Sequence, residues 1–448
     1  MASTHSEGPS ATMRLPKQNL VAVIGTTGVG KSKLSVALAR ALNGEVINGD
    51  SMQVYRGLDT ITNKHPIPER HNIPHHLLGH ISDRSSEYGL PQFEREAAKV
   101  VDDIHRRAKV PILVGGTHYY IQSFLMPNMT VANSEPRDLT EEEAKFLDEC
   151  DTSELFAKLK GVDPLIASKF HPRDRRKLRR ALEICWTTGR KASQIYADQK
   201  QHGQNQEVEI ARYRTLVFWV WSEPEALNPR LHARVDDMVN KGNLLGEVQE
   251  MTELYLNLDP LPDIDRGIWQ VIGFKEFLPY IESGTDEDRE KGVQDMKRAT
   301  VKYATTQVRW IRRKWLVAAA ESANDVTTVL LDASDLSKWD EKVEQPATEI
   351  AKEFLSGQEI HRSLRAPDGL EDMVQPAQEK DNSARPDNWI HFACDICMDE
   401  GEKFVCVGEE RWKIHLRSRR HRQTLKHINE RAAFERWKAS QDQTGQAI

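Results

Sequence analysis

A phosphate-binding motif stands near the start of the chain. Residues 25–32 are GTTGVGKS and match the pattern G-x-x-x-x-G-K-[ST]. Glycines in such a loop let successive backbone N–H groups turn toward phosphate oxygens, and the start of the following helix adds positive potential. Lys31 can supply a charge to a terminal phosphate, and Ser32 can offer a hydroxyl to Mg²⁺. The motif therefore predicts a site for a phosphate or a diphosphate, and does not by itself specify ATP.

A carboxylate follows the second predicted strand, which spans residues 45–49. Because the carboxyl ends of parallel strands meet at one edge of a sheet, we expect Asp50 to lie beside the phosphate loop. A carboxylate there can bind Mg²⁺, cap a helix or act as a base. The strand predicted over residues 109–117 ends in Gly115, Gly116 and Thr117 instead of the acidic residue typical of a Walker B site. This difference argues against a motor or switch ATPase.

Two basic segments could bind a nucleic acid. Residues 171–192 contain eight Lys or Arg and two acidic residues, and Leu178, Leu182 and Cys185 give the segment an apolar face. We therefore expect its arginines to point outward, toward RNA phosphates or, alternatively, only toward solvent. Residues 411–438 contain ten Lys or Arg and two acidic residues. This second segment also favours contact with RNA, with a protein-docking surface as the alternative.

Cysteines and histidines cluster near the C-terminal end. The pattern C-x2-C-x17-H-x5-H is formed by Cys394, Cys397, His415 and His421. Two thiolates and two imidazoles make a closed tetrahedral Zn²⁺ site, which suits a structural role better than a catalytic one. The module of residues 389–448 has little apolar core and therefore needs such a metal to fold. His427 and Cys406 stay open as alternative ligands.

Elements of an α/β protein must position these side chains. Apolar runs predict buried parallel strands, and helical patterns alternate with them. The predicted strands are residues 20–25, 45–49, 109–117, 215–221 and 327–334. The expected fold is a P-loop NTPase-like parallel sheet with its site at the carboxyl ends of the strands. Strand-like runs are absent between residues 127 and 212, where charged helical segments predict an inserted helical domain.

The expected domain boundaries follow these changes of pattern. We predict a disordered tail over residues 1–19, a catalytic core over 20–127 and 212–356, an inserted helical domain over 128–211, a flexible linker over 357–388 and a C2H2-type zinc finger with a basic helix over 389–448. The linker is inferred from the lack of periodicity and from its Pro, Gly and acidic residues.

Composition excludes some classes of protein. The 448 residues carry a net charge of −6, so any binding of nucleic acid must come from local patches. No stretch approaches the ~18 consecutive apolar residues of a membrane helix. Five cysteines do not suggest a disulfide framework, and residues 1–19 have no apolar core typical of a secretory signal. We expect a cytoplasmic protein, with mitochondria and the nucleus open as further compartments.

Motifs in the same order along the chain resemble those of the tRNA dimethylallyltransferase family, also called tRNA isopentenyltransferases. After the phosphate loop they are GEVINGDSMQVY (44–55), TNKHPIPERHNIPHHLLGH (62–80), VGGTHYY (114–120), RRKLRRALEICWTTGRKAS (175–193), RLHARVDDMV (230–239), WQVIGFKEF (269–277) and ATVKYATTQVRWIRRKW (299–315). The match is collinear from about residue 20 to residue 335. The added C-terminal zinc finger is similar to the eukaryotic form of the enzyme.

The resemblance implies transfer of a dimethylallyl group from dimethylallyl diphosphate to N6 of the adenine adjacent to the anticodon in certain tRNAs, with release of diphosphate. The residues implied to bind the diphosphate are Gly25, Thr26, Thr27, Gly28, Val29, Gly30, Lys31 and Ser32. Mg²⁺ on Ser32, loop amides and Lys31 would stabilise the leaving group. By similarity Asp50 is the base, Thr27 lines the reacting centre, and Arg234 lies near the diphosphate. Arg230 is the neighbouring alternative to Arg234.

The resemblance also implies which residues contact tRNA. They are Asp50, Ser51, Met52, Gln53, Thr117, Arg176, Lys177, Leu178, Arg179 and Arg180. We expect Thr117 and Tyr120 where the adenine enters after leaving its stack, with core packing as the alternative for Tyr120. His75 and His76 match the family pattern, and we expect a structural role for them.

One position departs from the family, and two other kinds of protein stay open. Thr306 stands where the family usually has a basic residue, a difference for which Lys302 and Arg309 would have to compensate. A P-loop kinase of nucleosides or other small molecules would explain residues 25–32, but neither the basic segments nor the finger. A non-enzymatic RNA-binding protein is the second alternative.

Overall fold

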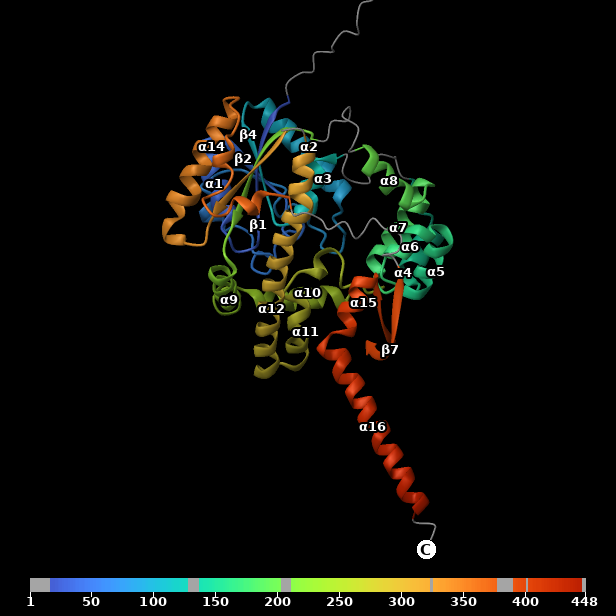
Figure 1. Cartoon of the computed structure of the whole chain (residues 1–448). Coiled ribbons are helices and arrows are strands. Elements are labelled where there is room, and N and C mark those ends of the chain that lie inside the picture. Colours follow the sequence, from blue (N-terminus) through green and yellow to red (C-terminus); the bar gives the residue numbers. More distant parts are fainter. Residues whose placement is uncertain are drawn as a thin grey trace, which may run out of the picture. The chain divides into compact units, whose positions relative to one another are not determined.

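The computed structural model describes residues 17–127, 137–202, 211–322, 325–376, 390–399 and 402–444. The chain divides into two compact units (Figure 1), with divisions after residues 130, 204 and 377. The first unit holds the described residues before the first division and between the second and third. The second unit combines the inserted helices with the C-terminal module. None of the helices in the described ranges has the length and apolarity needed to cross a bilayer.

The first unit is built on a parallel sheet. The described strands are β1 (Asn19–Gly25), β2 (Gly44–Asn48), β3 (His75–His76), β4 (Val110–Val114), β5 (Arg214–Trp221) and β6 (Val326–Asp332). Their order is β3-β2-β4-β1-β5-β6, and every adjacent pair is parallel. The α/β parallel-sheet prediction is confirmed. The two-residue strand β3 was not predicted, because a pair of histidines carries no strand pattern.

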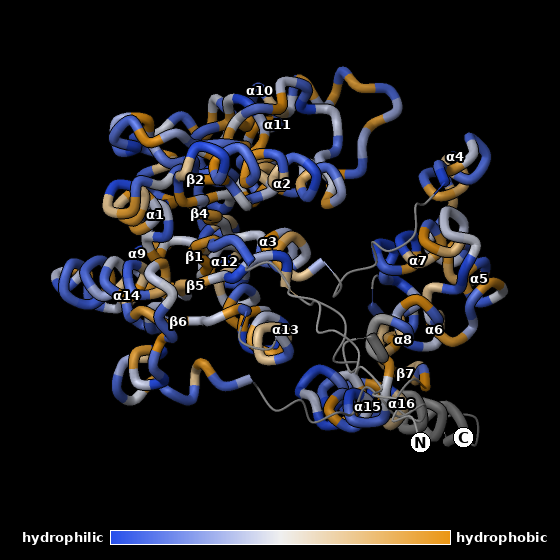
Figure 2. Tube along the Cα trace, turned by 90° about the horizontal axis from the view of Figure 1, so that it is seen from above, coloured by the Kyte–Doolittle hydropathy of each residue, from blue (hydrophilic) through white to orange (hydrophobic). Residues whose placement is uncertain are grey.

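Helices cover both faces of this sheet (Figure 2). They are α1 (Lys31–Ala41), α2 (Leu90–Arg106), α3 (His118–Leu125), α9 (Pro224–Asn240), α10 (Leu244–Leu256), α11 (Phe274–Ser283), α12 (Asp286–Trp310), α13 (Leu316–Glu321) and α14 (Gln345–Leu355). Side chains of β1 alternate between two cores: Leu20 and Ile24 pack with α2 and α3, whereas Val21 and Val23 pack with α1 and α14. A strand buried on both faces explains the continuous apolar run from which β1 was predicted.

The chain after α14 packs against the sheet edge. The Leu330 N–H donates to the Arg365 carbonyl (2.8 Å), and two short turns follow, η7 (Arg362–Leu364) and η8 (Glu371–Val374). Ile360 is buried, and Met373 and Val374 pack on the core. The first part of the segment predicted to be a flexible linker, residues 357–376, therefore contacts the core through isolated apolar residues. Its remainder lies outside the described residues, as do residues 1–16 of the predicted tail.

The second unit has its own apolar core. Its elements are α4 (Glu141–Glu149), α5 (Thr152–Val162), α6 (Pro164–Lys169), α7 (Arg175–Thr188), α8 (Ala192–His202), β7 (His391–Asp399), β8 (Glu402–Val407), α15 (Glu409–Leu416) and α16 (Arg419–Thr444). Leu155, Leu159, Leu178 and Leu182 pack together in the core of the helices. Capping boxes that begin at Thr140 and Asp151 start α4 and α5. Strands β7 and β8 form an antiparallel hairpin.

The C-terminal hairpin is hydrogen-bonded to the turn between α6 and α7. His171 Nε2 donates to the Val405 carbonyl (2.7 Å), and Arg173 donates to the carbonyls of Asp399 (3.1 Å) and Lys403 (2.9 Å). From the hairpin, His391 Nε2 lies 3.0 Å from the Phe170 carbonyl. The predicted boundaries separate the inserted domain from the finger, whereas these bonds join them in one unit.

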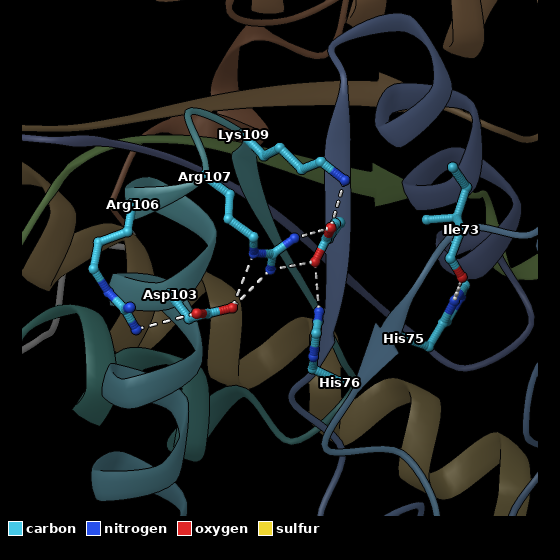
Figure 3. Close-up of polar contacts among 8 residues, drawn as sticks. Ile73, His75, His76, Asp103, Arg106, Arg107 and Lys109 are labelled. Carbon is cyan, nitrogen blue, oxygen red and sulfur yellow. Dashed lines mark hydrogen bonds and ion pairs between the residues drawn. The ribbon is translucent and has the colours of Figure 1, made fainter.

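A buried carboxylate fixes the edge of the first unit's sheet near β3 (Figure 3). Glu45 of β2 is 1% exposed, and it accepts hydrogen bonds from Arg107 and from Lys109 Nζ (2.7 Å). His76 Nε2 lies 2.7 Å from Glu45 Oε2, while His75 Nδ1 donates to the Ile73 carbonyl (2.8 Å). The Arg107 hydrogen bonds hold the pKa of Glu45 well below its ordinary value. Both histidines thus make contacts within the fold.

Candidate active site

The phosphate loop connects β1 to α1 and includes two positions that require glycine. Gly28 and Gly30 have φ values of 84° and 93°. A Cβ at Gly28 would lie 2.5 Å from Leu231 Cδ2, and one at Gly30 would lie 2.5 Å from the ring of Trp339. Both backbone conformation and close packing therefore require glycine at these two positions. The resulting curve leaves the N-terminus of α1 at Lys31 open toward the sheet edge.

Two cations lie at this loop without a carboxylate partner among the described residues. Lys31 Nζ donates to the Thr26 carbonyl (2.7 Å), and Arg234 Nη2 donates to Thr27 Oγ1 (2.8 Å). Burial lowers the pKa of Lys31 to about 8 and the pKa of Arg234 to about 10. The buried Arg234 Nε has no hydrogen-bond partner. Asp50 offsets part of the Lys31 charge, but two partly buried cations beside one carboxylate leave an excess of positive charge that favours an anion at this place.

Arg230 and Arg234 lie one turn apart on α9 but bind different groups. Arg230 Nη1 donates to the Ala333 carbonyl (2.7 Å), and its other nitrogen donates to the Ser334 carbonyl, just after β6. Arg230 is thus bound to backbone, and of the two arginines only Arg234 contacts the loop. Neither arginine simply faces solvent.

Asp50 follows β2 at the same sheet edge. Its Oδ1 accepts from the Met52 N–H (3.0 Å), and no helix begins there, so Asp50 does not act as a helix cap. Burial raises the pKa of Asp50, while the Met52 N–H and the nearby Lys31 charge oppose part of that rise. A carboxyl group whose pKa is shifted toward neutrality is a suitable proton acceptor.

Gln307 of α12 connects the loop to the end of β4. It is 3% exposed; its Oε1 accepts from the Thr27 N–H (2.8 Å), and its Nε2 donates to the Gly116 carbonyl (3.0 Å). Tyr303, one turn earlier, donates its hydroxyl to the same Gly116 carbonyl (3.3 Å). Sequence reasoning missed both residues, although they lie four apart in a segment that matches the family. Thr306, which stands where the family usually has a basic residue, is exposed.

His118, at the start of α3, contacts the first residue of the phosphate loop, Gly25. The sequence did not predict this contact. The residue is 3% exposed, and its Nε2 lies 3.2 Å from the Gly25 carbonyl. Burial, with the Lys31 charge as the second cause, lowers the pKa of His118 to about 3. The imidazole is therefore neutral at physiological pH and acts as a hydrogen-bonding support. The only sequence signal for it is its place in the VGGTHYY motif.

The predicted tRNA-contacting residues after β2 and β4 do meet. The Ser51 N–H donates to Thr117 Oγ1 (3.0 Å), and Gln53 Nε2 donates to the Thr62 carbonyl (3.0 Å). Ser51, Met52 and Gln53 are half-buried. They line the same edge as Asp50.

Tyr120 is partly buried and packs against the core beside α2. Its hydroxyl donates to the Tyr88 carbonyl (2.8 Å), and its ring packs 5.1 Å from that of Phe93 on α2. One turn of α3 carries Tyr120 from the sheet edge at Thr117 to the face that meets α2. The core-packing alternative describes this residue.

Helix α7 presents only part of its basic side chains to solvent. Arg176, Lys177 and Arg180 are exposed. Arg175 donates to the Leu147 and Asp148 carbonyls (3.1 Å each) at the end of α4, and Arg179 pairs with Asp148 (2.6 Å). Leu178 is fully buried. The expectation that all the arginines point outward is therefore wrong for Arg175 and Arg179, because the helical period places them on the face of Leu178.

Four side chains of the C-terminal module converge as a metal site. The ligand atoms of Cys394, Cys397, His415 and His421 all lie within 4.8 Å of one another, and the four residues are buried. His415 Nε2 has no hydrogen-bond partner. The alternatives lie elsewhere: His427 is exposed beside Glu430, and Cys406 is not in the cluster. The predicted set of four is thus the one brought together, and it could hold a metal ion.

Comparisons with known proteins agree with this arrangement. A family model described as IPP transferase matches residues 53–314. The tRNA dimethylallyltransferase of Saccharomyces cerevisiae is 41% identical over 443 residues, covering 98% of this chain and 99% of that protein. The human tRNA dimethylallyltransferase is 33% identical over 423 residues, covering 91% and 86%. A crystal structure of a eukaryotic dimethylallyltransferase acting on tRNA has a TM-score of 0.76 at 41% identity, covering 94% of this chain and 100% of that one. The chain therefore belongs to the tRNA dimethylallyltransferase family.

Proposed function

We propose that this protein transfers a dimethylallyl group from dimethylallyl diphosphate to N6 of the adenine adjacent to the anticodon of tRNA. The observation that carries the proposal is the placement of two cations on the phosphate loop, neither of them in an ion pair among the described residues, with Asp50 at the neighbouring strand end. The cations suit a diphosphate leaving group, and the carboxylate suits a proton acceptor beside it.

The loop residues hold the donor by its diphosphate. Backbone N–H groups, Lys31 and Arg234 surround the phosphate oxygens, and the Thr27 hydroxyl, held by Arg234, orients the group that leaves. The hydroxyl of Ser32 at the start of α1 is a hard oxygen ligand that suits Mg²⁺, which when bound would neutralise part of the diphosphate charge. Gln307 fixes the loop against Gly116, so that the donor meets a preformed site.

Asp50 takes the proton that the acceptor loses. N6 of the adenine attacks the allylic carbon, the bond from that carbon to the diphosphate oxygen breaks, and diphosphate leaves with the bonding electrons. The N6 proton, which becomes acidic as the new C–N bond forms, passes to the Asp50 carboxylate. The raised pKa of Asp50 makes it a stronger base than an ordinary aspartate.

The tRNA binds through phosphates as well as through the target base. Exposed basic residues of α7, led by Arg176 and Arg180, form a surface whose affinity for RNA depends on salt.

In the C-terminal module, two buried thiolates and two buried imidazoles are the ligand set of a closed structural Zn²⁺ site. We infer that this ion holds β7 against α15 and α16 and takes no part in the reaction.

The test is transfer of labelled dimethylallyl from its diphosphate to unmodified tRNA. We expect incorporation that needs a divalent cation, and we expect D50A to abolish it while keeping tRNA affinity within about twofold. D102N, which alters an exposed carboxylate on α2, serves as the matched control and retains activity. ATP-dependent phosphorylation of a nucleoside, without incorporation into tRNA, would favour the kinase alternative. Unchanged turnover in D50A would remove Asp50 as the base.

A further inference from the structure

Tyr303 reaches from the protein surface to the proposed base. Its hydroxyl donates to the Gly116 carbonyl (3.3 Å). Gly116 also borders Asp50, since a Cβ built there would lie 3.1 Å from Asp50 Oδ2 and 3.8 Å from Tyr303 Oη. Burial, followed by the negative charge of Asp50, raises the pKa of the Tyr303 hydroxyl. The tip of this side chain is therefore a neutral group beside the carboxylate.

Part of Tyr303 is exposed to solvent. The residue is 37% exposed although its hydroxyl is hydrogen-bonded in the site, so the side chain extends from the surface to the neighbourhood of Asp50. Gln307, one turn further along α12, is buried and bonded to the same Gly116 carbonyl, which fixes the helix face that carries the ring. A ring anchored at both its backbone and its hydroxyl loses little further freedom when a ligand packs on it.

We propose that the Tyr303 ring is the stacking surface for the adenine that leaves the anticodon loop, and that it directs N6 toward Asp50. The inference rests on the proposed function and names a residue that binds the acceptor base of that reaction. An aromatic ring contributes about 1–3 kcal/mol per stacked base, which corresponds to roughly 5- to 150-fold in binding. Tyr120, which was expected where the adenine enters, packs its ring against that of Phe93.

Two substitutions separate the ring from the hydroxyl. We expect Y303F to keep kcat/KM for tRNA within about threefold of the unsubstituted protein, because the ring remains. We expect Y303A to lower it by roughly 5- to 150-fold at saturating dimethylallyl diphosphate. The KM for dimethylallyl diphosphate should change less than threefold in both variants. Thermal unfolding of each variant checks that the fold is retained.

A spectroscopic measurement reports stacking without the reaction. A tRNA that carries 2-aminopurine at the acceptor position has no N6 amine to alkylate, and its fluorescence falls when the base stacks on an aromatic ring. We expect quenching with the unsubstituted protein and with Y303F, and bright fluorescence with Y303A bound at saturation. Y303L, which keeps an apolar side chain but has no aromatic ring, should also stay bright.

Each outcome decides the inference. Unchanged kcat/KM in Y303A, equal losses in Y303F and Y303A, or equal quenching in all variants would each overturn the stacking role. Failure of the proposed function looks different: the unsubstituted protein would then incorporate no dimethylallyl into tRNA, whatever the residue at position 303.

Discussion

Lys31 is a residue whose charge the protein has made sensitive to pH. Burial lowers its pKa to about 8, and the positive charge of Arg234 contributes while Asp50 opposes. The side chain is cationic below that value and becomes neutral above it. Since only the ammonium form attracts a diphosphate strongly, we expect kcat/KM for dimethylallyl diphosphate to fall about tenfold per pH unit above pH 8.

The matched variant for this prediction is K31R. A guanidinium stays charged throughout the measured range, so the alkaline fall should disappear even if the value at pH 7 is lower. A pH–rate profile from pH 6 to pH 9 checks both proteins, since Arg234, with a pKa of about 10, also stays mostly charged in this range. If K31R shows the same fall above pH 8 as the unsubstituted protein, the titrating group is not Lys31.

Residues of the site were predictable from sequence where the backbone conformation requires particular residue types at fixed spacing. The loop of residues 25–32 is such a case, because its glycines and its lysine stand at fixed spacing. Gln307 and His118 were not predictable, because each is a single polar residue in a helix and its role depends on which loop lies against it. The packing of Tyr120 was left between two alternatives, because its helical phase depends on where α3 begins.

Helix α7 is an element with two different basic faces, and variants can separate them. Arg176 and Arg180 are exposed, the latter paired with Glu183 (3.0 Å) in a weak surface ion pair. We expect the double variant R176A/R180A to weaken tRNA binding and to reduce the slope of log affinity against log salt by about 1 for each phosphate that is no longer neutralised. Filter binding or fluorescence anisotropy from 50 to 300 mM salt measures this slope.

The control on the same helix is R175A. Its guanidinium binds carbonyls at the end of α4, so its loss leaves those acceptors unsatisfied and should lower the free energy of unfolding by about 1–3 kcal/mol. The salt slope should hardly change. Similar salt slopes in R175A and R176A/R180A would show that α7 does not contact RNA through its exposed face.

Elements were predictable where apolar residues recur with a clear period. The sheet strands other than β3 follow from apolar runs, and most of α7 follows from its helical period. Residues 357–376 have no period, yet Ile360, Met373 and Val374 attach them to the core. Single apolar anchors in a polar segment give no pattern that a sequence can reveal.

At the scale of the whole molecule, loss of the metal ion from the Cys/His cluster should affect tRNA binding more than the reaction itself. We expect a chelator that strips the bound metal to lower tRNA affinity by tenfold or more, and to change the rate at saturating tRNA by less than threefold. The reason is that the ligands lie in the second unit with α7, while the reacting groups lie in the first. Single-turnover rates and binding constants before and after chelation, and after restoring Zn²⁺, test this expectation. A larger loss in the rate than in the affinity would contradict it.

The joining of the finger to the inserted helices was beyond prediction from sequence. The bonds from His171 and Arg173 end on backbone carbonyls, which every residue possesses. Arg173 also lies 3.6 Å from the Asp399 carboxylate, but Arg and Asp are too common in the sequence for this one pair to be predicted. The predicted boundaries could only separate the two segments by their distance along the chain.

That mode of attachment has a consequence for how this part of the protein can diverge. Because the acceptors are carbonyls of residues 399, 403 and 405, amino-acid replacements along the hairpin leave the acceptors in place. An insertion or deletion of one residue between β7 and β8 would instead shift the carbonyls away from both donors at once. Lineages that share this contact should therefore tolerate many substitutions in the hairpin but conserve its length.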